Sequence, residues 1–520
     1  MRATARLTIP VLLLCALIGS AAAQEPRLGT IDFPTSGSAA AQEHFIRGVL
    51  FLHSFEYASA AAAFQEAQRL DRDFAMAYWG EAMTYTHPVW NQQDLERARS
   101  TLQRLAPTPE ARRAKAPTER EKDYLEAIEV LYGSGDKAER DTAYSLAMKD
   151  LMDAHPEDME ARTFYALSLL GLSQGVRDVS TYMRAAAAAQ EVFWRNPQHP
   201  GAAHYLIHSF DDPVHAPLGL PAARAYSGIA PDAPHAQHMT THIFVALGMW
   251  DDVVSQNEIA TGDRWLPHHY SAWLAYGLLQ QGRYDDALEL LERVRTNMYA
   301  GDAEPPLRQR SYLSDMRAHY IINAAAWVSP ILDWEIELDD ASAETTARDL
   351  FTAGYAALRR ADRASAEADL KRMAVIDADV EYAEEAAVPN ILERELRAAL
   401  LLDAGEGNAA VALMMEATAA EDAMPVAFGP PVLVKPAHEM LGELLLELDR
   451  PAEARREFER ALQLAPKRAT SLLGLARAAS AAGDERTAAR AYETLCEIWH
   501  RADRDVQALS HGPGATGREH

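Results

Sequence analysis

Residues 450–495 read RPAEARREFERALQLAPKRATSLLGLARAASAAGDERTAARAYETL and contain an internal repeat. Small and apolar residues recur after 34 positions, with Ala454, Phe458 and Ala461 followed by Ala488, Tyr492 and Leu495. The spacings of four and three place each set on one face of a helix. A period between 20 and 50 residues predicts an array of stacked helical units.

This stretch resembles the tetratricopeptide repeat, in which two antiparallel helices occupy about 34 residues and a proline, here Pro466, precedes the next copy. The resemblance implies an all-α fold, a right-handed α-solenoid of tetratricopeptide-like helix pairs. It also implies a concave groove lined by the first helix of each pair. Further copies in the same register begin near Ala41, Ala75, Met159, Pro200, Pro234, His268, Ala347 and Ile391.

Composition favours the same class, because alanine runs such as 60–63 and 185–189 suit closely packed helices. Pro88 interrupts the second copy, and the copies between residues 301 and 434 are degenerate. We therefore expect a signal peptide at 1–23, an N-terminal linker at 24–39 and a solenoid with a histidine-rich groove at 40–300. Irregular or degenerate helical repeats follow at 301–434, then a C-terminal repeat pair at 435–502 and a disordered tail at 503–520.

The N-terminal sequence MRATARLTIPVLLLCALIGSAAA has the basic start, short apolar run and small-residue end of a secretory signal cut after Ala23. It predicts an exported protein, periplasmic or secreted, with no membrane span. Removing two arginines from a chain of net charge −26 leaves −28, which disfavours nucleic acid as a partner. Only Cys496 then remains, so a metal site would need His, Asp, Glu or Met ligands.

Half of the 18 histidines lie between residues 199 and 269. Two pairs have i,i+4 spacing, which places both imidazoles of a pair on one helix face. The pairs are His204 with His208 and His238 with His242, so the second follows the first by one repeat length.

The repeat register gives these residues a common direction. The pairs occupy positions 5 and 9 of their repeats, His235 and His269 occupy position 2, and Asp211 and Asp212 occupy positions 12 and 13. The resemblance implies that all these positions face the groove. Convergence of the four paired imidazoles predicts a divalent transition metal, Zn, Cu or Fe. Asp211 or Asp212 would be an oxygen ligand or an orienting partner, His235 a further ligand, and His215 would close the site.

Secondary candidates lie in the first two repeats. His53 and His87 are one repeat length apart, both at position 13, and Trp79 occupies position 5 beside them. They would form a second site or an aromatic wall of the same cavity. His269, at position 2 of a later repeat, is a further secondary candidate in the groove.

Three functions remain open from the sequence. The first is an exported scaffold whose groove binds a transition metal or a metal-dependent ligand. The second is a metal-dependent enzyme, a hydrolase or oxidoreductase, with Asp211, Asp212 or Glu81 as general base. The third is a metal-free groove for a peptide, protein or small molecule. The chain has no glycine-rich phosphate loop and no HExxH or GxSxG motif.

Overall fold

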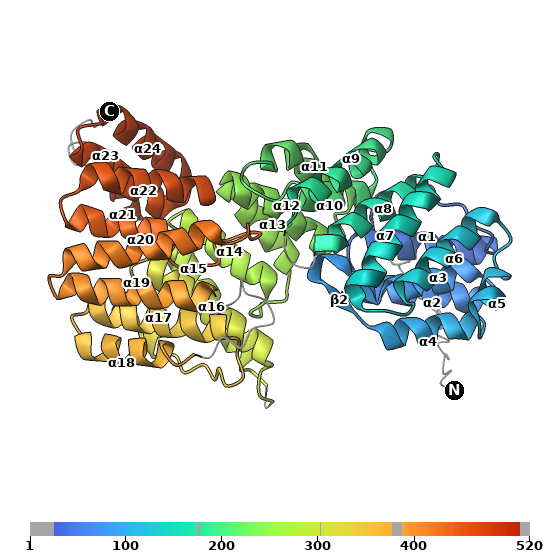
Figure 1. Ribbon diagram of the computed structural model, residues 1–520, viewed down its shortest axis with the longest axis horizontal. Helices are drawn as coiled ribbons and strands as arrows, with labels where there is room; N and C mark the ends of the chain where they lie inside the picture. The colour runs from blue at the N-terminus through green and yellow to red at the C-terminus, as the bar shows by residue number, and fades with distance from the viewer. Residues whose placement is uncertain (1–24, 174–176, 302, 377–386, 510–520) are drawn as a thin grey trace, which may run out of the picture.

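The computed structural model describes residues 25–173, 177–301, 303–376 and 387–509 (Figure 1). Nearly all of the regular structure in these ranges is α-helical, which confirms the all-α solenoid. The predicted signal peptide lies outside the described residues, so the structure does not bear on it. Among the described helices, none is long and apolar enough to cross a membrane.

The N-terminal half of the chain carries the helices from α1 to α15. They are α1 (Ala39–His53), α2 (Tyr57–Leu70), α3 (Ala75–Met83), η1 (Pro88–Trp90), α4 (Leu95–Leu105), α5 (Pro109–Arg113), α6 (Glu119–Leu131), α7 (Lys137–Ala154), α8 (Met159–Leu170), η2 (Gly171–Ser173), α9 (Val179–Arg195), α10 (Pro200–Ser209), α11 (Ala216–Ile229), α12 (Pro234–Leu247), α13 (Trp250–Thr261), α14 (His269–Gln280) and α15 (Tyr284–Met298). Two antiparallel strands, β1 (Thr86–His87) and β2 (Gln92–Gln93), flank η1 at the interruption that Pro88 predicts.

The C-terminal half continues with helices that stack on one another in Figure 1. They are α16 (Leu307–Asn323), η3 (Pro330–Asp333), α17 (Ala343–Arg359), α18 (Arg363–Met373), α19 (Ala387–Asp403), α20 (Gly407–Ala423), α21 (Ala437–Glu447), α22 (Pro451–Leu464), α23 (Ala469–Ala481), α24 (Glu485–Ile498) and α25 (Arg504–Leu509). The degenerate region 301–434 thus consists of α16 to α20, in which α17 packs on α18 and α19 on α20.

The repeat register explains how the helices pack at both ends of the chain. Phe64 lies between Gly48 and Gly80, and each glycine is so close to the ring that a side chain would collide with it. Phe458 lies in the same way between Gly442 and Gly474. Since small residues let helices approach closely, these glycines set the helix spacing around Phe64 and Phe458.

The turn between the two helices of a repeat needs a left-handed backbone conformation. Glycine supplies it in four repeats, at Gly248, Gly282, Gly405 and Gly483, all with positive φ. In the first repeat the equivalent residue is Phe55, with φ of 53°. A bulky residue in this conformation is a strained exception, and such exceptions concentrate at functional sites.

The solenoid curves until segments far apart in sequence meet. The end of α1 reaches α10, where His204 Nδ1 lies 2.7 Å from the carbonyl oxygen of His53. The C-terminal repeats return to the middle of the chain, where Trp499 Nε1 donates to the Gln280 carbonyl. The groove that the sequence predicts around the histidines is therefore a closed interior, because the first repeat packs across it.

Both ends of the described chain are bound to the solenoid. In the segment assigned to a linker, Phe33 is buried and Thr30 N donates to the Gln198 carbonyl. The prediction of a disordered tail from residue 503 is wrong for its first part, since residues 504–509 form α25. There Val506 is buried, and the Asp503 carboxylate accepts from Tyr284 N at the start of α15. Residues 510–520 lie outside the described ranges.

Candidate metal centre

The histidine cluster lies on α10, α12 and α14, the first helices of three successive repeats. The residues of both predicted pairs are buried, with His204 and His238 fully inaccessible to solvent. Pro200 begins α10 and Pro234 begins α12, because proline suits the first turn of a helix. His204 and His235 are the first histidines of the cluster on these two helices. These four side chains face the interior of the solenoid, and its curvature encloses them.

The structure brings His238 and His242 together with His269. One nitrogen from each ring lies within 4.8 Å of the other two. The Nε2 atoms of His238 and His242 are 3.2 Å apart. His269, a secondary candidate from the sequence, is therefore a full member of the closest group, which we call the histidine trio.

Two polar side chains orient the rings of this trio. The Nδ1–H of His242 donates to the Asp211 carboxylate at 2.5 Å. The Nδ1–H of His238 donates to Asn257 Oδ1 at 2.8 Å, and the Asn257 amide nitrogen donates to the Val253 carbonyl. The contact from His242 to Asp211 fixes the orientation of that ring. Asn257 was missed because it lies on a second helix, α13, to which the groove register does not apply.

Three more histidines lie next to the trio: His204, His208 and His235. Five imidazoles form a closed circuit, with neighbouring ring centroids 4.8 to 6.2 Å apart. The circuit runs through His204, His208, His242, His238 and His235. Phe55 packs against three of these rings, and Trp273 packs against all members of the trio.

Burial keeps most of these rings in the neutral form. Desolvation lowers the pKa of His204 and of His269 to about 3. It also lowers the pKa of His208, His235 and His238 well below the ordinary histidine value. A neutral imidazole is the form that coordinates a metal ion.

Two predicted residues pair with each other rather than with the trio. His215 Nδ1 lies 2.7 Å from the Asp212 carboxylate, which also accepts from Arg177. The Asp212 carboxylate oxygen further accepts from His215 N and so fixes the turn before α11. Burial alone would raise the pKa of the Asp212 carboxyl. The hydrogen bonds from His215 and the charge of Arg177 outweigh burial and lower this pKa. Asp212 and His215 thus form, with Arg177, a polar group at the C-terminal end of α10.

The predicted second site has a different composition. His53 is joined to Glu160 and His199, with Nε2 atoms 2.7 and 2.9 Å from the two carboxylate oxygens. The other nitrogen of His53 accepts from the Tyr205 hydroxyl, and that of His199 accepts from Ala202 N. Because every polar atom in this buried group has a partner, hydrogen bonding alone explains it. Glu160 occupies position 2 of its repeat, as His235 and His269 do, so the register could have found it.

His87 and Trp79 are not part of either group. The His87 ring stacks on Tyr57 with centroids 3.8 Å apart, and its Nε2 donates to the Thr84 carbonyl. Trp79 is fully buried in an aromatic core with Phe45 and Phe164. His53 thus lies with Glu160 and His199, whereas His87 lies with Tyr57 and Trp90, and Trp90 in turn packs against His235.

Acid should destabilise the protein through Glu160. Burial would raise the pKa of this carboxyl, but His199 and His53 together lower it from 4.5 to about 2. A depressed pKa contributes stability that is complete above pH 4.5 and is lost as the pH falls from 4.5 towards 2. We expect Glu160→Gln to lose about 3 kcal/mol of unfolding free energy at neutral pH and to lack this acid-sensitive component. Denaturant unfolding at several pH values would measure this. The expectation is contradicted if the unfolding free energies of the wild type and of Glu160→Gln change equally with pH between pH 4.5 and 2.

A pocket of about 710 Å³ adjoins the cluster. Residues 424–436 form one wall, and Asp211, which orients His242, forms part of another. Gly429 in this segment, with φ of 83°, lies so close to the Trp273 ring that a side chain would collide with it. Residues 424–436 therefore pack on the outer side of Trp273, whose ring packs against the histidine trio.

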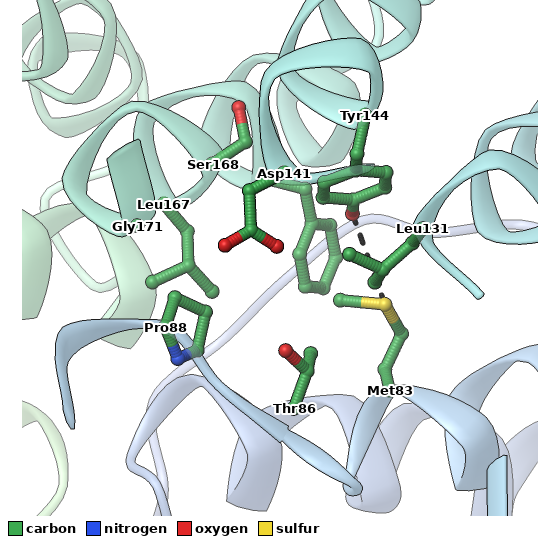
Figure 2. Close-up of a pocket in the computed structure, with 10 residues that line it drawn as sticks. Met83, Thr86, Pro88, Leu131, Asp141, Tyr144, Leu167, Ser168 and Gly171 are labelled. Carbon is green, nitrogen blue, oxygen red and sulfur yellow. Dashed lines mark hydrogen bonds between the residues drawn. The ribbon is translucent and has the colours of Figure 1, made fainter. Parts of the chain in front are cut away.

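A smaller cavity lies in the N-terminal repeats, between α3, α7 and α8 (Figure 2). Its volume of about 20 Å³ is enough for a single water molecule. Asp141, whose carboxylate points into it, pairs with Lys137 at 2.5 Å. This cavity is too small for a substrate.

Glu81, a general-base candidate from the sequence, is held by other side chains. It is buried and accepts hydrogen bonds from Gln68 and Arg104. These hydrogen bonds compensate for the burial of the Glu81 carboxylate, which is consistent with a structural role. Of the candidate bases, Asp211 is the one that contacts the trio.

The tetratricopeptide repeat family matches residues 436–468. Curated protein sequences give no match. Among solved structures, the human IFIT1 dimer with m7Gppp-AAAA is 15% identical with a TM-score of 0.35, covering 91% of this chain and 92% of its own. Yeast Tom70 is 14% identical with a TM-score of 0.27, covering 90% and 95%. Cut9–Hcn1 of the APC/C is 8% identical with a TM-score of 0.32, covering 91% and 76%. With its paired helices, the chain is an all-α helical-repeat protein, and its residues 436–468 match the tetratricopeptide repeat.

Proposed function

We propose that this protein is an exported helical-repeat scaffold that binds a divalent transition metal in its interior, with His238, His242 and His269 as ligands. The observation that carries the proposal is the 3.2 Å separation of the His238 and His242 Nε2 atoms. The signal-like sequence of residues 1–23 supports export.

The hydrogen bonds of the two rings explain why this separation matters. Asp211 and Asn257 accept from the Nδ1 atoms, so in the neutral rings both Nε2 atoms carry lone pairs. Two lone pairs this close to each other repel unless a positive charge lies between them. Two nitrogens bound at 2.0–2.1 Å to one tetrahedral zinc ion would be about 3.3 Å apart. The pair therefore has the spacing that a shared ion requires.

The surroundings favour a metal ion over an added proton. Burial lowers the pKa of His238 well below its ordinary value, so the ring resists protonation. The contact from Asp211 to His242 is the carboxylate–histidine arrangement that fixes a metal-binding tautomer and increases its basicity. Imidazole nitrogens suit Zn, Cu and Fe.

Elemental analysis of the purified mature protein tests the proposal. We expect bound metal in stoichiometric amount after loading with Zn²⁺, Cu²⁺ or Fe²⁺ and removal of excess ions. Protein that carries no stoichiometric metal after each of the three loadings would overturn it.

Asp211→Asn should weaken the metal site without removing a ligand. An amide presents either a neutral oxygen or an N–H to His242 Nδ1, so it polarises the ring less than a carboxylate does. Loss of such a partner usually lowers metal affinity by about 10–100-fold. Competition with a chromophoric chelator would measure the change, and Asp212→Asn is the matched control. Equal affinities for both variants would show that Asp211 does not act on the site.

A second candidate function is metal-dependent catalysis, favoured by Asp211, which lines the pocket of about 710 Å³ and also accepts the hydrogen bond from His242. Apolar residues such as Val214, Ala246 and Val426 line this pocket, and its carboxylates disfavour anions. The substrate would be an apolar molecule that is uncharged or cationic. Asp211 would hold a proton in that reaction, as the sequence proposed.

A pocket-filling variant tests this candidate. Zn- and Cu-loaded protein would be assayed against uncharged aromatic esters and aromatic alcohols, beside Ala246→Trp, which fills the pocket. The enzyme reading predicts turnover that Ala246→Trp removes while metal content stays unchanged. Turnover that is equal in both proteins would exclude this pocket as the substrate site.

A further inference from the structure

The pocket of about 710 Å³ has mostly apolar walls and lies between the histidine-bearing repeats and the C-terminal repeats. Its walls include Val245 and Ala246 of α12 and Leu462 and Leu464 of α22. Residues 424–436 add methionine, valine, leucine and proline side chains. Small-molecule sites typically combine such apolar walls with a few polar groups that fix the orientation of the ligand. The polar groups of this pocket therefore define which ligand it can hold.

Two aromatic rings line the pocket, and their polar atoms have partners within the protein. Trp250 Nε1 donates to the Lys467 carbonyl at 3.0 Å. The Tyr276 hydroxyl accepts from Arg468 at 3.1 Å. These residues thus offer the pocket chiefly their rings, which present apolar surface and also attract cations through the ring face.

Four carboxylates line the pocket, and three of them are held by a histidine or an arginine. The three pairs are Asp211 with His242, Asp212 with Arg177, and Asp422 with Arg460. The only basic side chain of the lining, Arg460, is therefore already engaged. These three carboxylates have partners that the protein itself supplies.

Glu421, on α20, is the exception. The residues that the structure describes give it no ion pair, and its carboxylate accepts from the backbone N of His438 at 3.0 Å. The His438 ring is held by Glu457, with Nδ1 2.7 Å from that carboxylate. Burial raises the pKa of Glu421 from 4.5 to about 7, and the contacts with His438 do not offset it. A cation beside Glu421 would stabilise its ionised form.

We propose that this pocket binds a small apolar amine, whose ammonium group pairs with Glu421 and whose hydrocarbon part, preferably aromatic, packs between the apolar walls. The inference goes beyond metal binding, because it uses neither the trio nor a bound ion. It also narrows the substrate class of the catalytic candidate from uncharged or cationic molecules to organic cations.

Two probes that differ only in charge test the proposal. Purified mature protein, freed of metal with a chelator, would be titrated calorimetrically at neutral pH with 1-naphthylmethylamine and with 1-naphthalenemethanol. A hydrogen bond to a charged partner contributes enough that we expect the wild type to bind the amine about 10–100-fold more tightly than the alcohol. Glu421→Gln should lose this preference and keep the affinity for the alcohol, which also shows that the variant is folded.

Two further variants serve as controls. Glu416→Gln removes one negative charge from the same helix, at an exposed side chain 3.8 Å from Arg394 and outside the pocket. It should keep the wild-type preference for the amine, which separates pairing with Glu421 from attraction to an acidic protein. Ala246→Trp, which fills the pocket, should weaken the binding of both probes.

Each contrary result is specific. An equal preference for the amine in the wild type and Glu421→Gln, or an equal loss in Glu421→Gln and Glu416→Gln, would overturn the role of Glu421. Wild-type affinity for the amine in Ala246→Trp, or no binding of either probe by the wild type, would overturn the pocket as the site. Since the protein is free of metal, these outcomes are independent of the metal site, which elemental analysis tests.

Discussion

Replacing both His238 and His242 by alanine is expected to abolish metal binding at the trio. The change removes the two nitrogens that lie 3.2 Å apart and leaves His269 as a single ligand. Loss of an orienting partner alone weakens metal sites by about 10–100-fold, so loss of two ligands should weaken binding by at least about 10³-fold. Chelator competition with Zn²⁺ would measure this loss.

The same variant needs a control for folding, because it leaves the buried Asp211 without its histidine. His238→Gln with His242→Gln keeps most of the volume and a hydrogen-bonding group at each position. We expect it to lose metal affinity as the alanine pair does while retaining more of the wild-type stability. Wild-type zinc affinity in the glutamine pair would exclude these two rings as ligands.

Arg468→Met is expected to destabilise the protein by about 3–5 kcal/mol, because it breaks a buried ion pair and leaves the Glu439 carboxylate with only the longer contact to Lys435, at 3.8 Å. Arg468 and Glu439 are both fully buried, with nitrogen–oxygen distances of 2.8 and 3.1 Å. Arg468 also donates to the Tyr276 hydroxyl on α14, 192 positions earlier in the chain. The pair thus joins the C-terminal repeats to the helix that carries His269. Chemical denaturation would measure the loss.

The partner charge provides the control. Burial opposes ionisation of Glu439, but Arg468 and Lys435 lower its pKa to about 2, so it is charged at neutral pH. Adding Glu439→Gln to Arg468→Met removes the stranded charge and should recover part of the lost stability. A single variant within about 0.5 kcal/mol of the wild type would show that the pair contributes little.

The sequence by itself determined the repeat architecture and the positions of most of the cluster residues. The repeat period, the glycines beside Phe64 and Phe458, and the two HxxxH pairs are local features, and each depends on helix geometry within one or two repeats. For the same reason the repeat register predicts one common face for His204, His208, His238 and His242, and all four side chains are buried.

Only the tertiary structure decided which histidines meet and that they are enclosed. The curvature of a solenoid is the sum of small rotations at every interface between repeats, so an irregular insertion such as that around η1 changes where distant repeats lie. Through this curvature Phe55 covers the rings of α10 and α12, and His53 meets Glu160 rather than His87. The choice of His269 as third member of the trio depends on the approach of α14 to α12, which no spacing within a single repeat specifies.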